Sequence, residues 1–102
     1  MKILFDYKIF YQQKVGGISN YFYNLGKQLI KLNQDILYSI PLHKNEYLRK
    51  IEKKYKKGIY LAKFPSRINM VVENINHLLT EKTINSYKPN IIHETYYSKK
   101  IY

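Results

Sequence analysis

The sequence contains no cysteine, and none of its apolar runs approaches the length of a membrane-spanning helix. Without cysteine the chain forms no disulfides and no thiolate metal sites, which is typical of a cytoplasmic protein. A helix that crosses a bilayer needs about 20 apolar residues, and no such stretch occurs. The N-terminal apolar run, residues 3–5, is followed at once by Asp6, so we expect no signal peptide. We therefore expect a cytoplasmic protein, either free or bound at the inner face of the membrane.

Arginine and acidic residues are also scarce. Only Arg49 and Arg67 are arginines among 18 basic residues, and seven acids leave a net charge of +11. Such a charge favours a polyanionic partner, either nucleic acid, an anionic membrane or a nucleotide diphosphate. Recognition of base edges and of phosphates by paired hydrogen bonds favours arginine over lysine. Part of the charge also reflects a composition rich in Lys, Ile, Asn and Tyr, as an AT-rich coding sequence produces. We therefore do not expect nucleic acid to be the partner.

The apolar pattern predicts four strands in 102 residues, with no internal repeat and no linker. Residues 3–5 form a short continuous apolar run, which is typical of a parallel strand buried on both faces. Residues 36–40, 59–64 and 91–93 are the other predicted strands. Since strands alternate with helices, we expect an α/β fold over residues 1–102, a partial doubly wound, Rossmann-like parallel sheet flanked by helices. We expect this to be one incomplete domain, with no second domain in the chain.

Three stretches between the predicted strands have helical periodicity. In the first, apolar residues recur every three or four positions from Ile18 to Leu32, directly after a pair of glycines. In the second, residues 44–57, seven basic residues accompany two acids. This stretch predicts a short basic amphipathic helix that suits an anionic membrane. In the third, the predicted apolar face comprises Ile68, Val71, Val72, Ile75, Leu78 and Leu79.

Two unusual segments follow the first and the fourth predicted strands. In a Rossmann-type order these strands are neighbours, and ligands bind beyond their carboxyl ends. Residues 6–17 and residues 93–97 should then face one crevice. Gly16 and Gly17 precede a helix, where glycine lets backbone approach a ligand and free N–H groups favour an anion. An ordinary tight turn explains the same pair, and the spacing matches neither a nicotinamide fingerprint nor a P-loop.

His93 follows two isoleucines at the end of a predicted strand, with Glu94 beside it. A histidine here can donate to a sugar hydroxyl or a phosphate, or act as a base. The alternative is a histidine bonded to backbone at the sheet edge. We interpret His43 and His77 as surface residues. The three histidines have no metal-ligand spacing, so we expect neither a metal nor another cofactor.

Tyrosines also gather near both segments. Tyrosine rings can stack on a sugar or a base, but packing around the start of the helix explains them equally simply. The residues concerned are Tyr7, Tyr11, Tyr21, Tyr23, Tyr96 and Tyr97.

Two stretches about 75 residues apart resemble one enzyme family. Residues 5–10 (FDYKIF), Gln13 and residues 16–25 (GGISNYFYNL) are similar to the first strand, glycine loop and first helix of one group of enzymes. These are the retaining, two-Rossmann-domain (GT-B) glycosyltransferases of the large family 4 type. Residues 90–97 (NIIHETYY) resemble the segment of the same enzymes that ends in a His-x-Thr-Tyr-Tyr signature.

The resemblance implies an activity and a set of site residues. The N-terminal domain of such enzymes chiefly holds the acceptor, and its glycine loop approaches the diphosphate and sugar of the donor. Carried over, His93 becomes a catalytic-site contact to the transferred sugar. The implied substrate-binding residues are Gly16, Gly17, Ser19, Glu94, Thr95 and Tyr96. Two positions depart from the family pattern, namely Asn20, where arginine is usual, and Glu94, where proline is common.

The resemblance also implies partners. In the family a second domain, with two glutamates seven residues apart, binds the nucleotide and most of the donor sugar. We therefore expect a polysaccharide-forming glycosyltransferase fragment that is inactive alone. Its parent enzyme would take a nucleotide-sugar donor and a glycan or lipid-linked acceptor. The chain could be a fragment, one half of a split enzyme or a degenerate remnant. The alternative is a small, basic, non-catalytic module that binds nucleic acid or an anionic membrane.

Overall fold

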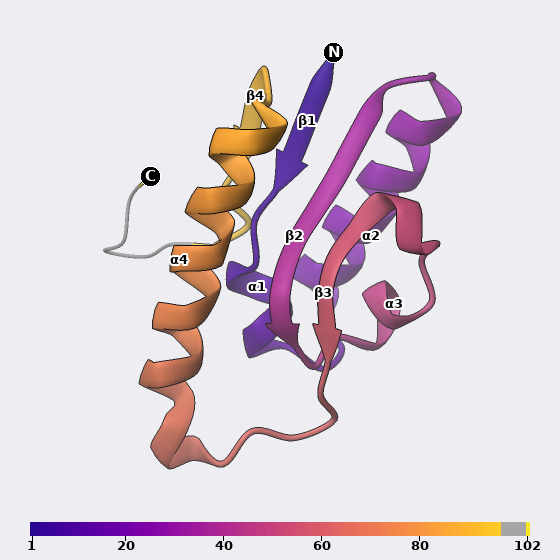
Figure 1. Cartoon of the computed structure of the whole chain (residues 1–102). Helices are drawn as coiled ribbons and strands as arrows, with labels where there is room; N and C mark the ends of the chain where they lie inside the picture. The colour runs from indigo at the N-terminus through magenta and orange to yellow at the C-terminus, as the bar shows by residue number, and fades with distance from the viewer. Residues whose placement is uncertain (97–101) are drawn as a thin grey trace.

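A computed structural model describes residues 1–96 and residue 102. Four strands form one parallel sheet in the order β3-β2-β1-β4 (Figure 1). The strands are β1 (Lys2–Phe5), β2 (Asp35–His43), β3 (Lys56–Tyr60) and β4 (Ile91–His93). The helices are α1 (Lys8–Gln12), α2 (Gly17–Lys31), α3 (Glu46–Arg49) and α4 (Asn69–Tyr87), with 3-10 turns η1 (Lys53–Tyr55) and η2 (Ser66–Ile68). The predicted α/β class, with a parallel sheet flanked by helices, is confirmed.

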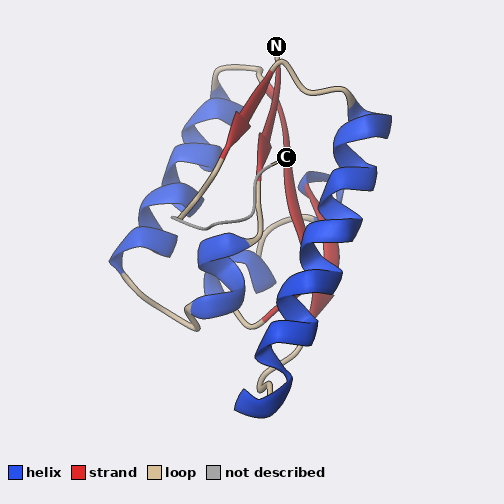
Figure 2. Ribbon diagram, turned by 90° about the vertical axis from the view of Figure 1, so that its left-hand side faces the viewer, coloured by secondary structure: helices blue, strands red, loops and turns tan. Residues whose placement is uncertain are grey.

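The sheet lies between α2 on one face and α4 on the other (Figure 2). Two consecutive residues of β2 show this arrangement, because successive side chains of a strand point to opposite faces. The hydroxyl of Tyr38 donates to the carbonyl of Phe22 in α2 at 2.7 Å, whereas the hydroxyl of Ser39 bonds Thr80 in α4 at 2.8 Å. Helices therefore cover both faces of the parallel sheet, an arrangement compatible with the predicted Rossmann-like fold.

The apolar core fills the face covered by α1, α2 and α3. Phe5 of β1 stacks on Tyr38 of β2 with ring centroids 4.8 Å apart, and both side chains are fully buried. Gly26 lets α2 approach this layer, because a Cβ there would lie 1.8 Å from the Tyr38 hydroxyl oxygen. The buried core residues are Ile3, Phe5, Tyr7, Ile9, Phe10, Ile36, Tyr38, Ile40 and Leu48.

The face covered by α4 buries Leu4 and Val72 and also has polar contacts. The side-chain amide of Asn76 accepts from the N–H of Leu42 at 2.6 Å and donates to its carbonyl at 2.9 Å. Together with the Ser39–Thr80 bond, this orients α4 with its polar side chains toward β2. Of the six residues in the predicted apolar face only Val72 is buried, so that face does not pack on the sheet.

The basic helix predicted over residues 44–57 is wrong. The Asn45 side chain caps one turn, α3, by accepting from the N–H groups of Tyr47 and Leu48 at 3.1 Å each. The Lys56 ammonium donates to the last carbonyls of this turn, at 2.8 Å from that of Leu48 and 3.0 Å from that of Arg49. Strand β3 then begins at Lys56, earlier than predicted, with Gly58 pressed against the backbone of β2.

A short helix, α1, which the sequence did not predict, follows β1. Helix α2 begins at Gly17, one residue earlier than predicted, because the glycine pair was expected to precede the helix. Within the described part of the chain, no helix combines the length and apolarity that crossing a bilayer requires.

Candidate functional site

The carboxyl ends of β1 and β4 meet, as the predicted strand order requires. Phe5 and His93 are register partners, and the N–H of Asp6 donates to the His93 carbonyl at 3.1 Å. The segments that follow these two strands therefore adjoin, although 87 positions separate Asp6 from His93 in sequence. This shared edge is where a doubly wound sheet offers a binding crevice.

His93 lies between the end of β1 and α2. Its ring stacks on Phe5 with centroids 5.2 Å apart, and lies 6.2 Å from the ring of Phe22 in α2. Among residues 1–96 and 102, none hydrogen-bonds its ring nitrogens, so those nitrogens could bond a ligand. Apolar contacts hold the ring in place, and the backbone bond to Asp6 fixes the strand end beneath it.

The glycine turn lies on the same helix as the Phe22 contact. Gly17 is the first residue of α2, about 7.5 Å along the helix axis from Phe22. It is exposed, and a Cβ placed on it would meet nothing within 4 Å. The first intrahelical bond runs from the N–H of Asn20 to the carbonyl of Gly16, so the N–H groups of Gly17 and Ile18 point out of the helix end. The glycine turn and His93 therefore flank the first turns of α2.

Ser19 and Gln13 hold the shape of this turn. The Ser19 side chain is buried, and its hydroxyl donates to the carbonyl of Gly16 at 3.2 Å. The Gln13 side-chain oxygen accepts from the Ser19 N–H at 3.3 Å, and it would collide with any Cβ at Gly16. Ser19, a predicted substrate-binding residue, therefore lies beneath the turn and shapes it.

Thr95 joins the segment after β4 to the start of α1. Its hydroxyl donates to the Asp6 carboxylate at 2.8 Å and accepts from the N–H of Ile9 at 3.0 Å. Its N–H also donates to the same carboxylate oxygen at 2.9 Å. Thr95 is buried, so its place in the site is to position the neighbouring Glu94.

A buried lysine connects Asp6 with Glu94. The Lys8 side chain is 2% exposed, and its ammonium lies 3.7 Å from the Asp6 carboxylate and 2.5 Å from that of Glu94. Glu94 is half exposed, so one carboxylate oxygen of the cluster is accessible from solvent. Two carboxylates around one ammonium make the cluster net negative, which sets it apart from the basic surface of the chain.

The sequence led us to interpret His77 as a surface residue, and this interpretation is wrong. Its Nδ1 lies 3.2 Å from the Tyr7 hydroxyl, its Nε2 lies 3.2 Å from Glu81, and its ring stacks on Tyr102 at 4.7 Å. The Tyr102 hydroxyl in turn donates to Asp6 at 3.0 Å. Burial, followed by the nearby Glu73 carboxylate, raises the pKa of Tyr7 above its ordinary value.

His43 is also buried, in contrast to its interpretation as a surface residue. Its Nδ1 accepts from the N–H of Asn45 at 3.0 Å, and only 1% of the residue is exposed. Burial, with the Lys56 charge as a second cause, lowers the pKa of His43 to about 4. A neutral imidazole here orders the turn before α3, and this histidine lies outside the candidate site.

The remaining site residues differ in their exposure. Tyr96 is partly exposed beside Thr95, whereas Tyr97 lies outside the described residues. Tyr7 is fully buried and Tyr21 is mostly exposed, so the tyrosines near the first segment do not form one stacking platform. Across the described residues, no group of three or more His, Asp or Glu side chains could hold a metal ion.

The sequence interpretation missed Asp6, Lys8 and Tyr102. One sequence signal for the first pair exists, because an acid and a lysine two positions apart interrupt the apolar residues that follow β1. No local pattern indicates the contact of Tyr102 with Asp6, since 96 positions separate them.

No protein-family model matches this chain, and neither the curated proteins nor the solved structures yield a match.

Proposed function

We propose that this chain is the acceptor-side part of a glycosyltransferase that moves a sugar from a nucleotide diphosphate to a glycan or lipid-linked acceptor. The main support is the shared edge of β1 and β4, which brings His93 against Phe22 of α2, the helix that begins at the glycine turn. These are the two segments that resemble the glycosyltransferase motifs.

We assign a ligand contact to each of three residues at this edge. Gly17, with open space where a Cβ would be, lets the backbone approach the diphosphate, and the exposed N–H groups of the first turn of α2 face its charge. A ring nitrogen of His93 bonds a hydroxyl of the transferred sugar. Glu94, held by Lys8, accepts a hydrogen bond from a second hydroxyl.

Charge stabilisation completes the proposed mechanism. As the bond from sugar to diphosphate breaks, negative charge grows on the leaving oxygen. Preorganised N–H donors that point at this charge stabilise it at the moment of reaction. The outcome at the sugar carbon, retention, follows from the family resemblance alone.

The proposed partner is a nucleotide-binding domain. By the resemblance, this second domain holds the nucleotide and closes over the donor, so the chain alone should lack turnover. A transfer assay tests this with the purified chain, a panel of nucleotide-diphosphate sugars and a mixed glycan acceptor. No product is expected, and robust turnover by the chain alone would overturn the division into two parts.

A binding assay tests the site itself. We expect calorimetry to detect weak binding of a nucleotide-diphosphate sugar to the wild type and its loss in Gly17→Ala. Gln28→Ala, an exposed change farther along α2, is the matched control and should bind as the wild type does. Equal binding by Gly17→Ala and the wild type would contradict the proposed role of the turn.

A further inference from the structure

The outward side of α4 carries apolar residues that the sheet does not cover. Val71, Ile75 and Leu78 recur at intervals of four and three, so they share one side of the helix. Val71 is 55% exposed and Leu78 is 57% exposed. The opposite side carries Asn76 and Thr80, which bond β2, and this bonding fixes the rotation of α4. The apolar stripe therefore faces solvent because of specific hydrogen bonds.

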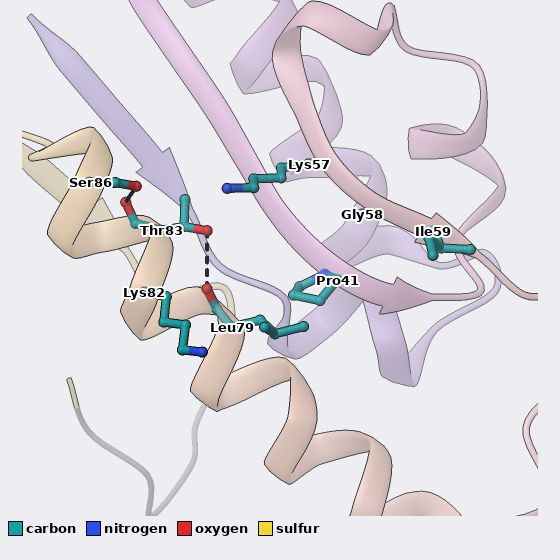
Figure 3. A pocket seen from close by; sticks show the side chains of 8 residues that line it. All are labelled: Pro41, Lys57, Gly58, Ile59, Leu79, Lys82, Thr83 and Ser86. Atoms are coloured by element: carbon teal, nitrogen blue, oxygen red, sulfur yellow. Dashed lines mark hydrogen bonds between the residues drawn. The ribbon is translucent and has the colours of Figure 1, made fainter.

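The stripe continues into a groove between α4 and β3. The groove has a volume of about 480 Å³, and Figure 3 shows its lining side chains. Its apolar members include Pro41, Ile59 and Leu79, and Ile59 on the edge strand is mostly exposed. We call the stripe and the groove together the α4–β3 face. A contiguous exposed apolar surface of this kind marks an interaction site.

The charged residues that line the groove are all basic. Lys57 from β3 and Lys82 from α4 line the groove, and no acid is among its lining residues. The two acids of α4 lie elsewhere. Glu81 pairs with His77 at 3.2 Å, and Glu73 lies near Tyr11, where burial and its carboxylate raise the pKa of Tyr11 to about 12. The two acids of α4 therefore do not line the groove.

We propose that the α4–β3 face docks on an anionic lipid surface. Apolar side chains enter the boundary between headgroups and acyl chains, while Lys57 and Lys82 contact lipid phosphates. A second copy of the chain fits poorly, because it would bring the same lysines together on two molecules of charge +11. Nucleic acid would pair with the lysines but leave the apolar stripe in water. The inference does not depend on the proposed glycosyltransferase function.

Vesicle co-sedimentation tests the proposal with the full chain. The vesicles are pure phosphatidylcholine or phosphatidylcholine with about one third phosphatidylglycerol. We expect binding to the anionic vesicles only. The double variant Val71→Ser with Leu78→Ser should bind about tenfold more weakly, because it removes two apolar side chains from the contact. Both residues are exposed, so unfolding curves should match the wild type.

Matched control variants distinguish binding through this face from binding through net charge or through exposed apolar residues elsewhere. Lys57→Gln with Lys82→Gln should weaken binding about tenfold, whereas Lys53→Gln with Lys54→Gln, an equal loss of charge in η1, should change it less than about twofold. Val15→Ser with Leu32→Ser, at two exposed apolar positions elsewhere, should also leave binding within about twofold.

Three results would overturn the proposal. The first is no binding to anionic vesicles. The second is binding that the serine double variant leaves unchanged and that a nucleic acid oligomer competes away, which would indicate a general polyanion site. The third is a dimer in sedimentation velocity that the serine variant abolishes, which would make a second copy the occupant. Binding of nucleotide sugars by calorimetry tests the proposed function separately, since it does not involve this face.

Discussion

The carboxylate of Asp6 accepts both the N–H and the hydroxyl hydrogen of Thr95, at 2.9 and 2.8 Å. Asp6 directly follows β1 and Thr95 follows β4, so this one carboxylate joins the two segments of the candidate site. Because both residues are buried, the contact is isolated from water. The same carboxylate also neutralises part of the charge of the buried Lys8.

Replacing Asp6 by alanine should destabilise the chain strongly. The change removes one of the two carboxylates that lie near the buried Lys8 ammonium, and breaking a buried charge pair costs about 3 kcal/mol. Urea unfolding measures the loss. Glu52→Ala, which removes an exposed partner of Lys54, is the control and should cost less than about 0.5 kcal/mol. Equal losses in the two variants would show that the buried cluster contributes little.

Stability should fall as the pH drops from 7 to 5, because of His43. The unfolded histidine takes up a proton near its ordinary pKa, whereas burial lowers the pKa of the folded residue to about 4. The unfolded state then binds more protons in this window, so unfolding becomes easier by about 2 kcal/mol at pH 5. Of the charged groups near this imidazole, Lys56 lowers its pKa and Glu46 raises it.

The variant His43→Asn isolates this effect, since its side-chain oxygen can accept from Asn45 as Nδ1 does. Urea unfolding at pH 7 and pH 5 measures the free energy of unfolding of both proteins. The loss of this free energy between the two pH values should be smaller in the variant than in the wild type, by about 2 kcal/mol. An unchanged pH dependence in the variant would assign the effect to other groups.

Two identical substitutions at different glycines should have opposite consequences. Gly58→Ala places a Cβ 1.7 Å from the carbonyl oxygen of Ile40 in β2, so β3 must shift, at a cost of about 2 kcal/mol or more. Gly17→Ala meets nothing within 4 Å and adds a better helix former, so its stability should hold or rise by up to about 1 kcal/mol. Thermal unfolding of both variants tests these two expectations. If Gly17→Ala is destabilised, the expectation for Gly17 is wrong and the variant is unsuitable for the ligand-binding test.

Asn76 should be needed for the attachment of α4. Asn76→Ala leaves the N–H and carbonyl of Leu42 without their partner, which costs about 2 kcal/mol. Hydrogen exchange at the Leu42 amide should accelerate at the same time. The exposed Asn74→Ala provides the control on the same helix, and comparable exchange in the two variants would contradict the bridging role.

Strands β1, β2 and β4 were predictable because they contain short apolar runs separated by helical periodicity, whereas the basic start of β3 at Lys56 was not. The neighbouring positions of β1 and β4 followed from the order of these runs and are confirmed. The start of α2 was predictable to within one residue, since glycine pairs seldom lie within a helix.

The rotation of α4 was not predictable from periodicity, because the pairing of Asn76 with the backbone of β2 decides it. The burial of His43 and the contact of Tyr102 with Asp6 depend on residues distant in sequence or on the path of a turn. The predicted basic helix failed for a similar reason. Lys56 belongs to β3 and bonds the end of α3, a role that its charge alone does not indicate.

The most direct test of the central claim is a residue-resolved NMR titration of the labelled chain with nucleotide-diphosphate sugars. We predict amide shifts at residues 16–19 and 93–96, which the same concentration of inorganic sulfate does not reproduce. Shifts confined to the lysines of residues 50–57, or identical shifts with any polyanion, would contradict a sugar-nucleotide site at the edge of β1 and β4.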